Sequence, residues 1–129
     1  MIVLDTHAWL WWTSAPSRLS RRARAAIEAA DRVGVCTISA WEIAMLVVRE
    51  RIALDRRVDD WVRQALAHEP VLALPLTSGA AVAAALLERE GFAGDPADRM
   101  IYATAREQGA RLVTRDRDMR AFDAARTVW

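Results

Sequence analysis

The sequence contains no lysine, only one cysteine and no long apolar run, and each absence narrows what the protein can be. The single Cys36 cannot form an internal disulfide, and its apolar neighbours indicate a small core residue in a reducing compartment. The longest apolar stretch, residues 80–87, is far shorter than the roughly 20 residues that cross a bilayer. An acid at position 5 also argues against a secretory signal. We therefore expect a cytoplasmic protein without a membrane segment.

The missing lysine limits the chemistry that a carboxylate site can perform. A phosphatase with an aspartate nucleophile usually places a second acid two residues further on and uses a Lys elsewhere. A signalling domain that accepts a phosphoryl group on Asp also relies on a Lys. Here His7 stands two residues after Asp5, and all eighteen basic residues are Arg. Both classes are therefore excluded.

What is present is the composition of an ordinary globular protein. The chain has 129 residues, of which 53% are apolar and 27% charged, and this length is sufficient for one compact core. The formal net charge of +1 argues neither for nor against a polyanionic partner. Because no repeat, low-complexity tract or linker interrupts the chain, we expect a single domain over residues 1–129.

Short β-branched runs alternate with longer stretches of helical spacing. Strands are predicted at residues 2–4, 32–37, 71–76, 111–115 and 126–129, and helices at roughly 21–30, 40–51, 58–68, 78–90 and 97–108. This alternation predicts an α/β fold with a parallel sheet that is covered by helices on both faces. In such sheets, ligands bind beyond the carboxyl ends of the strands.

Four acids are predicted to meet at that edge of the sheet. Asp5 closes the first strand, and Asp116 closes the fourth. Glu42 and Asp98 each lie in the first turn of a predicted helix, and the helix of Glu42 directly follows a strand. The acids are far apart in the sequence, but this topology brings them together. The convergence indicates a functional site.

Each acid also has a structural alternative. Ser39 and Glu42 have the spacing of a capping box, in which two side chains satisfy free amides of the first helical turn. Asp95 and Pro96 have the pattern of a helix start, with Asp98 in the first turn, where the helix dipole favours an anion. The acids that follow strands could instead cap a turn or a short helix. One shared site explains all four at one edge better than four independent caps.

A cluster of carboxylates without Cys or paired His favours Mg²⁺ or Mn²⁺ over zinc. His7 and His68 lack the spacing of metal ligands, and Asp118 is expected to be a solvated neighbour of the site. Mg²⁺ keeps several waters and binds substrate phosphate oxygens, which suits phosphodiester hydrolysis by a metal-activated water. No Ser or Cys nucleophile is then required.

Four segments, in this order and over nearly the whole chain, resemble the PIN-domain ribonucleases. They are VLDTHA at 3–8, ISAWEIA at 38–44, GDPADRMIYATA at 94–105 and LVTRD at 112–116. The patterns D-P-x-D-R-x-I and D-T-H rarely occur together by chance. The chain is most similar to the VapC-type toxins of bacterial toxin–antitoxin pairs.

This resemblance implies a fold, a site and a set of partners. The fold is a three-layer α/β/α sandwich with a central parallel sheet, usually assembled as a homodimer. The activity is metal-dependent endonucleolytic cleavage of RNA. The resemblance implies a catalytic quartet holding one or two Mg²⁺ or Mn²⁺ ions: Asp5, Glu42, Asp98 and Asp116. It also implies pocket-lining Thr6 and Ser39, and Arg99 supporting the site or orienting a neighbouring acid.

The six tryptophans are more than the family pattern requires. Core packing is the leading interpretation for Trp9 and Trp41. In relatives, the C-terminal segment of a cognate antitoxin lies across an apolar groove near these helices and reaches the acidic pocket. Trp11 or Trp12 could line such a groove, or could stack on RNA bases, and both alternatives stay open.

The sequence thus predicts a metal-dependent endoribonuclease that acts as the toxin of a toxin–antitoxin pair. Two alternatives remain. One is a non-catalytic module with a PIN-like fold that binds RNA or antitoxin and uses its acids only as helix caps. The other is a PIN nuclease that acts in RNA processing outside a toxin–antitoxin pair.

Overall fold

A five-stranded parallel sheet forms the centre of the computed structural model, which describes residues 1–129. The strands are β1 (Ile2–Leu4), β2 (Val33–Cys36), β3 (Val71–Leu74), β4 (Arg111–Val113) and β5 (Thr127–Val128). They lie in the order β3-β2-β1-β4-β5, so β1 is central. The chain first forms β2 and β3 on one side of β1 and then crosses to form β4 and β5 on the other side. As a result, β4 pairs with β1 although about a hundred residues separate them.

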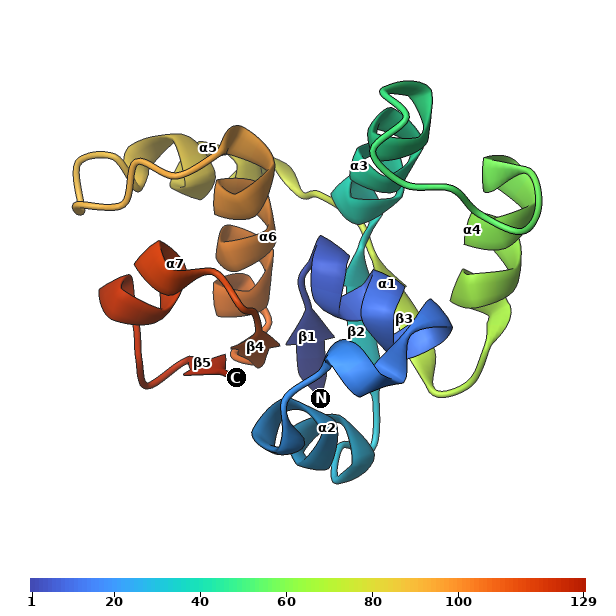
Figure 1. The fold of residues 1–129 in the computed structure, drawn as a ribbon. Helices are drawn as coiled ribbons and strands as arrows, with labels where there is room; N and C mark the ends of the chain where they lie inside the picture. Colours follow the sequence, from blue (N-terminus) through green and yellow to red (C-terminus); the bar gives the residue numbers. More distant parts are fainter.

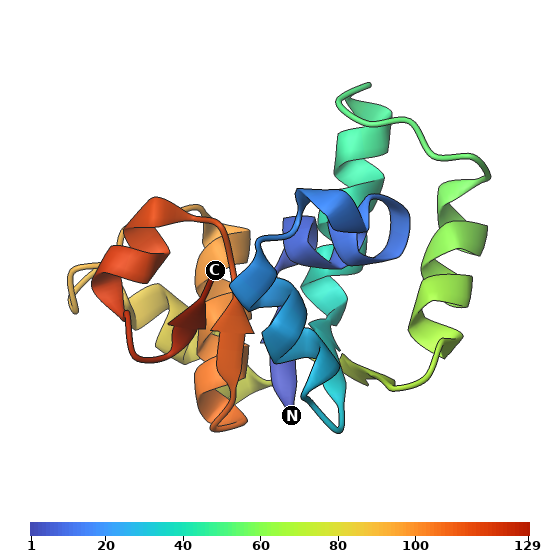
Figure 2. The same cartoon turned by 60° about the horizontal axis from the view of Figure 1, so that its bottom comes forward.

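Helices cover both faces of this sheet (Figures 1 and 2). They are α1 (Thr6–Ser14), α2 (Arg21–Glu28), α3 (Thr37–Val48), α4 (Val58–Ala67), α5 (Ser78–Leu86), α6 (Pro96–Glu107) and α7 (Arg117–Phe122), with a 3₁₀ turn at Pro16–Arg18. None of them is both long enough and apolar enough to cross a membrane. The expected parallel sheet between two helical layers is confirmed.

Alternate residues of each strand enter two separate cores, because successive side chains of a strand point to opposite faces. One core contains Leu4 and Val33 together with Trp9 of α1 and Trp61 of α4. The second core contains Val3, Cys36 and Leu112 together with Ile101 and Tyr102 of α6. Cys36 is therefore a small core residue, as predicted.

Helix α3 begins three residues before the predicted start. Cys36, the last residue of β2, is its N-cap and makes no side-chain capping bond. Ser39 consequently lies inside the first turn, so the predicted capping box of Ser39 and Glu42 is wrong. In contrast, α6 begins as predicted, with Asp95 as N-cap and Pro96 at the first helical position.

Tryptophan burial differs from the prediction at one position. Trp9 is fully buried and packs against Trp61, with ring centroids 5.1 Å apart, which confirms its place in the core. Trp41 is 55% exposed, so its predicted burial is wrong. The buried residues of α3 are Ser39 and Ile43. Because Trp41 lies two positions from each of them, the helical repeat turns it toward the opposite side.

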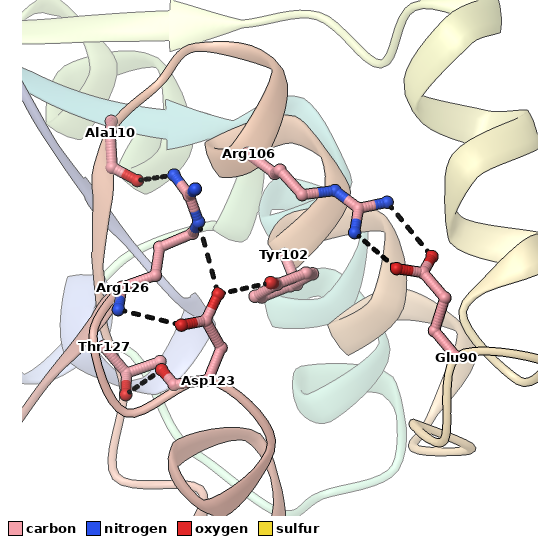
Figure 3. A network of polar contacts seen from close by, with 7 residues as sticks. All are labelled: Glu90, Tyr102, Arg106, Ala110, Asp123, Arg126 and Thr127. Atoms are coloured by element: carbon pink, nitrogen blue, oxygen red, sulfur yellow. Dashed lines mark hydrogen bonds and ion pairs between the residues drawn. The ribbon is translucent and has the colours of Figure 1, made fainter.

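A polar network ties α7 and β5 to α6 (Figure 3). The Tyr102 hydroxyl of α6 donates to Asp123 Oδ2 at 2.6 Å, directly after α7. The backbone amide of Arg126 donates to Asp123 Oδ1 at 3.1 Å, and its guanidinium lies 3.4 Å from Oδ2. Next to it, Arg106 pairs with Glu90. Asp123 thus links the end of α7 to α6.

Candidate metal centre at the carboxyl edge of the sheet

Asp5 lies where β1 ends and α1 begins. Its Oδ1 accepts a hydrogen bond from the Ala8 amide at 2.8 Å, so the side chain is the N-cap of α1. Its own amide donates to the Val113 carbonyl of β4 at 3.1 Å. The residue is only 8% exposed. The central strand and its neighbour therefore hold a buried carboxylate at the carboxyl edge.

Glu42 is held beside Asp5 by Thr6, the residue that follows Asp5 in the chain. The Thr6 hydroxyl makes a short hydrogen bond to Glu42 Oε1 and lies 3.1 Å from the Ser39 hydroxyl. Ser39 and Glu42 are three positions apart and so share one side of α3. Thr6 and Ser39 therefore both lie next to the Glu42 carboxylate.

Asp98 and Asp95 bring α6 to the same place. Carboxylate oxygens of Glu42, Asp95 and Asp98 lie within 4.8 Å of one another. Asp95 also accepts a hydrogen bond from the Ala97 amide at 2.9 Å as the N-cap. Sequence reasoning treated Asp95 only as a cap. The signal that it missed is the three-residue spacing from Asp98, which puts both acids on one side of the first turn.

Asp116 lies three residues after β4 and is the N-cap of α7. Its Oδ1 accepts from the Met119 amide at 2.7 Å, and its own amide donates to the Thr114 hydroxyl at 3.1 Å. Asp118 is exposed in the first turn of α7, where it meets none of the other acids. Asp116, unlike Asp118, thus faces the edge at which Asp5 lies.

Burial and neighbouring acids raise the pKa values of Asp98, Asp5 and Glu42. At Asp98 burial is the largest cause and, together with the negative charges of Glu42, Asp5, Asp95 and Asp116, raises the pKa to about 7. The charges of the other three predicted acids therefore all act on Asp98. Such mutual repulsion is what a bound cation relieves.

Burial and hydrogen bonds act in opposite directions on the pKa values of two other acids, Asp5 and Glu42. Burial raises the pKa of Asp5 to about 6 against hydrogen bonds with Thr114 and the Ala8 amide, and the charge of Asp116 raises it further. Burial also raises the pKa of Glu42, and the Thr6 hydrogen bond partly opposes it. Each hydrogen bond favours the ionised form of its carboxyl group, whereas burial disfavours that form.

The donor set fits a hard divalent cation. The grouped ligands are all carboxylates, with no thiolate or imidazole among them, and oxygen ligands suit Mg²⁺ or Mn²⁺. The nearest imidazole, that of His7, is exposed and packs toward Trp11, with ring centroids 5.5 Å apart. The residues present are therefore compatible with divalent metal binding.

Arg99 lies beside the centre without contacting its acids. The guanidinium is largely buried and forms an ion pair with Glu88, at 3.4 Å, in the segment after α5. This contact joins the start of α6 to the end of α5. A role of Arg99 in orienting an acid of the site remains a prediction.

A large hollow lies between α1, α4 and residues 52–56. Its volume is about 950 Å³, and its apolar walls include Trp11, Trp12, Ile52, Leu54 and Trp61. Trp11 and Trp12 both line this hollow, and a role of either residue toward an antitoxin or RNA stays a prediction. This hollow, the groove between α1 and α4, is lined by the C-terminal half of α1. Asp5 caps the other end of that helix, so the groove extends along α1 away from the acidic edge.

Comparison with known proteins places the chain in a family. The PIN domain family matches residues 2–125. Ribonuclease VapC22 of Mycobacterium tuberculosis is 45% identical over 130 aligned residues, which cover 99% of this chain and 98% of that protein.

Solved structures share the fold at lower identity. A toxin-antitoxin complex from Klebsiella pneumoniae contains a chain with a TM-score of 0.70 and 21% identity, covering 100% of this chain and 97% of that one. VapBC2 from Rickettsia felis, bound to a DNA fragment from its promoter, matches with a TM-score of 0.68 and 13% identity over 98% and 97% of the two chains. The chain described here belongs to the PIN domain family and is a relative of the VapC ribonucleases.

Proposed function

We propose that this protein is an endoribonuclease and the toxin of a toxin–antitoxin pair, with Mg²⁺ or Mn²⁺ as its cofactor. The observation that carries the proposal is the meeting of Glu42, Asp95 and Asp98 from two helices, in one field with Asp5 and Asp116. The ribonuclease name of a relative that matches almost the whole chain supports RNA as the substrate.

Asp5, Glu42, Asp98 and Asp116 would hold the metal, with Asp95 as an additional neighbour. When bound, Mg²⁺ or Mn²⁺ supplies an activated water and stabilises charge on the phosphate. Thr6 orients the Glu42 carboxylate, and the amides of Ala8 and Met119 fix one oxygen each of Asp5 and Asp116. Lone pairs of both Asp carboxylates remain available to a ligand.

Cleavage of RNA by the purified protein, free of antitoxin, tests the enzymatic part. We expect single-stranded or looped RNA to be cut with Mg²⁺ or Mn²⁺ and to stay intact with EDTA. Glu42→Gln should abolish cutting, whereas Glu28→Gln, an exposed acid on α2, should not. Undiminished cleavage in EDTA would remove the metal mechanism. Binding of RNA without cleavage would instead favour the non-catalytic alternative.

The groove between α1 and α4 is the surface that we assign to the antitoxin. Its apolar walls suit an apolar segment of the partner, and an Arg or Lys of that segment would reach the carboxylates in a charge-assisted contact. Expression of the toxin alone should arrest bacterial growth, and the small neighbouring gene should relieve the arrest. If the neighbouring product neither binds nor protects, an RNA-processing nuclease becomes the better interpretation.

A homodimer is the assembly that we propose for the toxin. Exposed apolar side chains are found on α3, at Trp41 and Val48, and on α5, at Val82 and Leu86. Both helices pack against α6. Large apolar side chains in such exposed positions are typical of an interface with another chain.

A further inference from the structure

Two arginines share one tryptophan beside the acidic edge. The guanidinium carbon of Arg18 lies 4.5 Å from the centroid of the Trp11 ring, and that of Arg115 lies 5.9 Å from it. Arg18 ends the 3₁₀ turn after α1, whereas Arg115 follows β4. Two segments that are nearly a hundred residues apart thus place like charges around one ring.

These two guanidinium groups have no acidic partner. Neither Arg18 nor Arg115 takes part in an ion pair, and both are exposed. Contact with an aromatic face holds a guanidinium in place and leaves its N–H groups free, because these donors lie in the plane of the group. Two oriented cations without an acidic partner can donate hydrogen bonds to a phosphate.

The pair lies next to the proposed metal centre. Arg115 directly precedes Asp116 in the chain, and Trp11 lies about 9 Å along α1 from Asp5. The C-terminal end of the chain closes the cluster from the other side, with the Trp129 ring centroid 5.8 Å from that of Trp11. Figure 2 shows this end beside the segment that follows α1. A strand of RNA leaving the acidic edge would meet the two arginines first.

We propose that Arg18 and Arg115 form a phosphate-binding subsite that holds the RNA backbone on one side of the bond to be cut. This subsite rests on the proposed ribonuclease function. Trp11 is only 6% exposed, so its ring supports the guanidinium groups and is not open to stacking by a base. The contact therefore positions the RNA irrespective of its sequence.

The occupant is RNA rather than the antitoxin because of where Arg115 lies. Arg18 also borders the groove between α1 and α4, but Arg115 does not line that groove. Arg115 stands instead on the side of Asp116. A ligand that runs from the acidic edge across Trp11 contacts both arginines, and among such ligands a polyanion gains most, whereas the Arg or Lys of an antitoxin segment is repelled by them.

The salt dependence of RNA binding tests the subsite. The measurement is fluorescence anisotropy of a short labelled single-stranded RNA, in the Asp98→Asn background with Mg²⁺ so that the RNA stays intact. Each phosphate contact contributes about 0.7 to the slope of log affinity against log salt for single strands. We expect Arg18→Gln and Arg115→Gln each to reduce the slope by about 0.7, equally for two unrelated RNA sequences.

Arg111 provides a matched control, because it is an exposed arginine at the start of β4, whereas Arg115 lies two residues beyond the other end of that strand. Arg111→Gln should keep the slope of the parent. Arg115→Lys should keep the slope as well, with weaker binding because Lys cannot form two parallel bonds to a phosphate.

Several outcomes would overturn the subsite. The subsite is refuted if Arg18→Gln and Arg115→Gln give the same salt slope as Arg111→Gln. It is also refuted if these variants weaken the binding of only one of the two RNA sequences. Weaker binding of the antitoxin with unchanged binding of RNA would assign the surface to the antitoxin instead. In each case the protein with native acids would still cut RNA. Absence of cutting by that protein would contradict the proposed function itself.

Discussion

At the scale of single residues, helix capping and membership of the acidic site are compatible. Asp5 and Asp116 each use one carboxylate oxygen, Oδ1, to accept an amide of the helix that they begin. Each keeps carboxylate lone pairs for another ligand. The two interpretations of these acids were treated as alternatives in the sequence, but the geometry satisfies both. Capping even helps the site, because it fixes the direction of the side chain.

Asp98→Asn should change stability with opposite signs in the absence and presence of metal. The metal-free protein holds several carboxylates together, so removal of one charge should raise its free energy of unfolding by about 1–2 kcal/mol. Millimolar Mn²⁺ should raise the melting temperature of the parent strongly and that of the variant weakly, since only the folded parent holds the full ligand set. We therefore expect the variant to melt higher in EDTA, lower in Mn²⁺, and to cut no RNA.

If Asp98 interacted only with the helix dipole, Asp98→Asn would lower the free energy of unfolding by about 0.3–1 kcal/mol with or without metal. A variant that melts lower than the parent in both conditions and still cuts RNA would return Asp98 to that role. Asp118→Asn, at an exposed position in the first turn of α7, offers a control for the loss of a negative charge near a helix N-terminus.

The same carboxyl groups should give the metal-free protein an unusual pH dependence. The folded-state pKa values of Asp98 and Asp5, about 7 and about 6, lie above the ordinary value of 3.8. Their contribution to stability is therefore complete below about pH 4 and is lost as the pH rises toward 7. Urea unfolding in EDTA should show the free energy of unfolding falling by about 2–4 kcal/mol over this window. Asp98→Asn should make the fall shallower, and an equally steep fall would contradict the assignment.

At the scale of helices and strands, period and composition predicted most of the fold. β-branched runs identified all five strands, and the first was predicted with its observed bounds. Helix α1 was not assigned a range, because its mostly apolar sequence THAWLWWTS has no polar face to reveal the period. The exposure of Trp41 was missed because its large apolar side chain indicated core packing, whereas the helical repeat of α3 places it opposite the buried Ile43. Pairing of Arg99 with Glu88 depends on the bend between α5 and α6, which no local pattern encodes.

The short helix α7 depends on a contact outside its own sequence. Six residues are too few to form a stable helix alone, and Asp123 fixes its end to Tyr102. Tyr102→Phe removes that hydrogen bond and should lower the free energy of unfolding by about 1–2 kcal/mol. Since this bond also lowers the pKa of Asp123, the difference between parent and variant should shrink below about pH 4. Chemical denaturation at pH 7 and at pH 3 measures it, and an unchanged difference would show that lost packing, not the bond, is responsible.

At the scale of the whole molecule, the exposed side chains of α3 and α5 predict the assembly. Val82 on α5 is 60% exposed, and a charge buried at an interface is costly. Val82→Glu should therefore convert the proposed dimer to a monomer and should lower the free energy of unfolding of the subunit by no more than about 0.5 kcal/mol. Light scattering with size-exclusion chromatography measures the mass. Gln64→Glu, on exposed α4, is the control, and a parent that is already monomeric would refute the assembly.

The central place of β1 also sets when, during translation, the acidic edge can be completed. A nascent chain that has emerged as far as β3 has Asp5 and Glu42 but neither Asp98 nor Asp116, and β1 has a partner on one side only. The pocket closes when β4 pairs with the free side of β1 and the Asp5 amide reaches the Val113 carbonyl. A chain made in this order acquires the last of its four acids, Asp116, only after β4 has been made, so the proposed ribonuclease activity would begin only then.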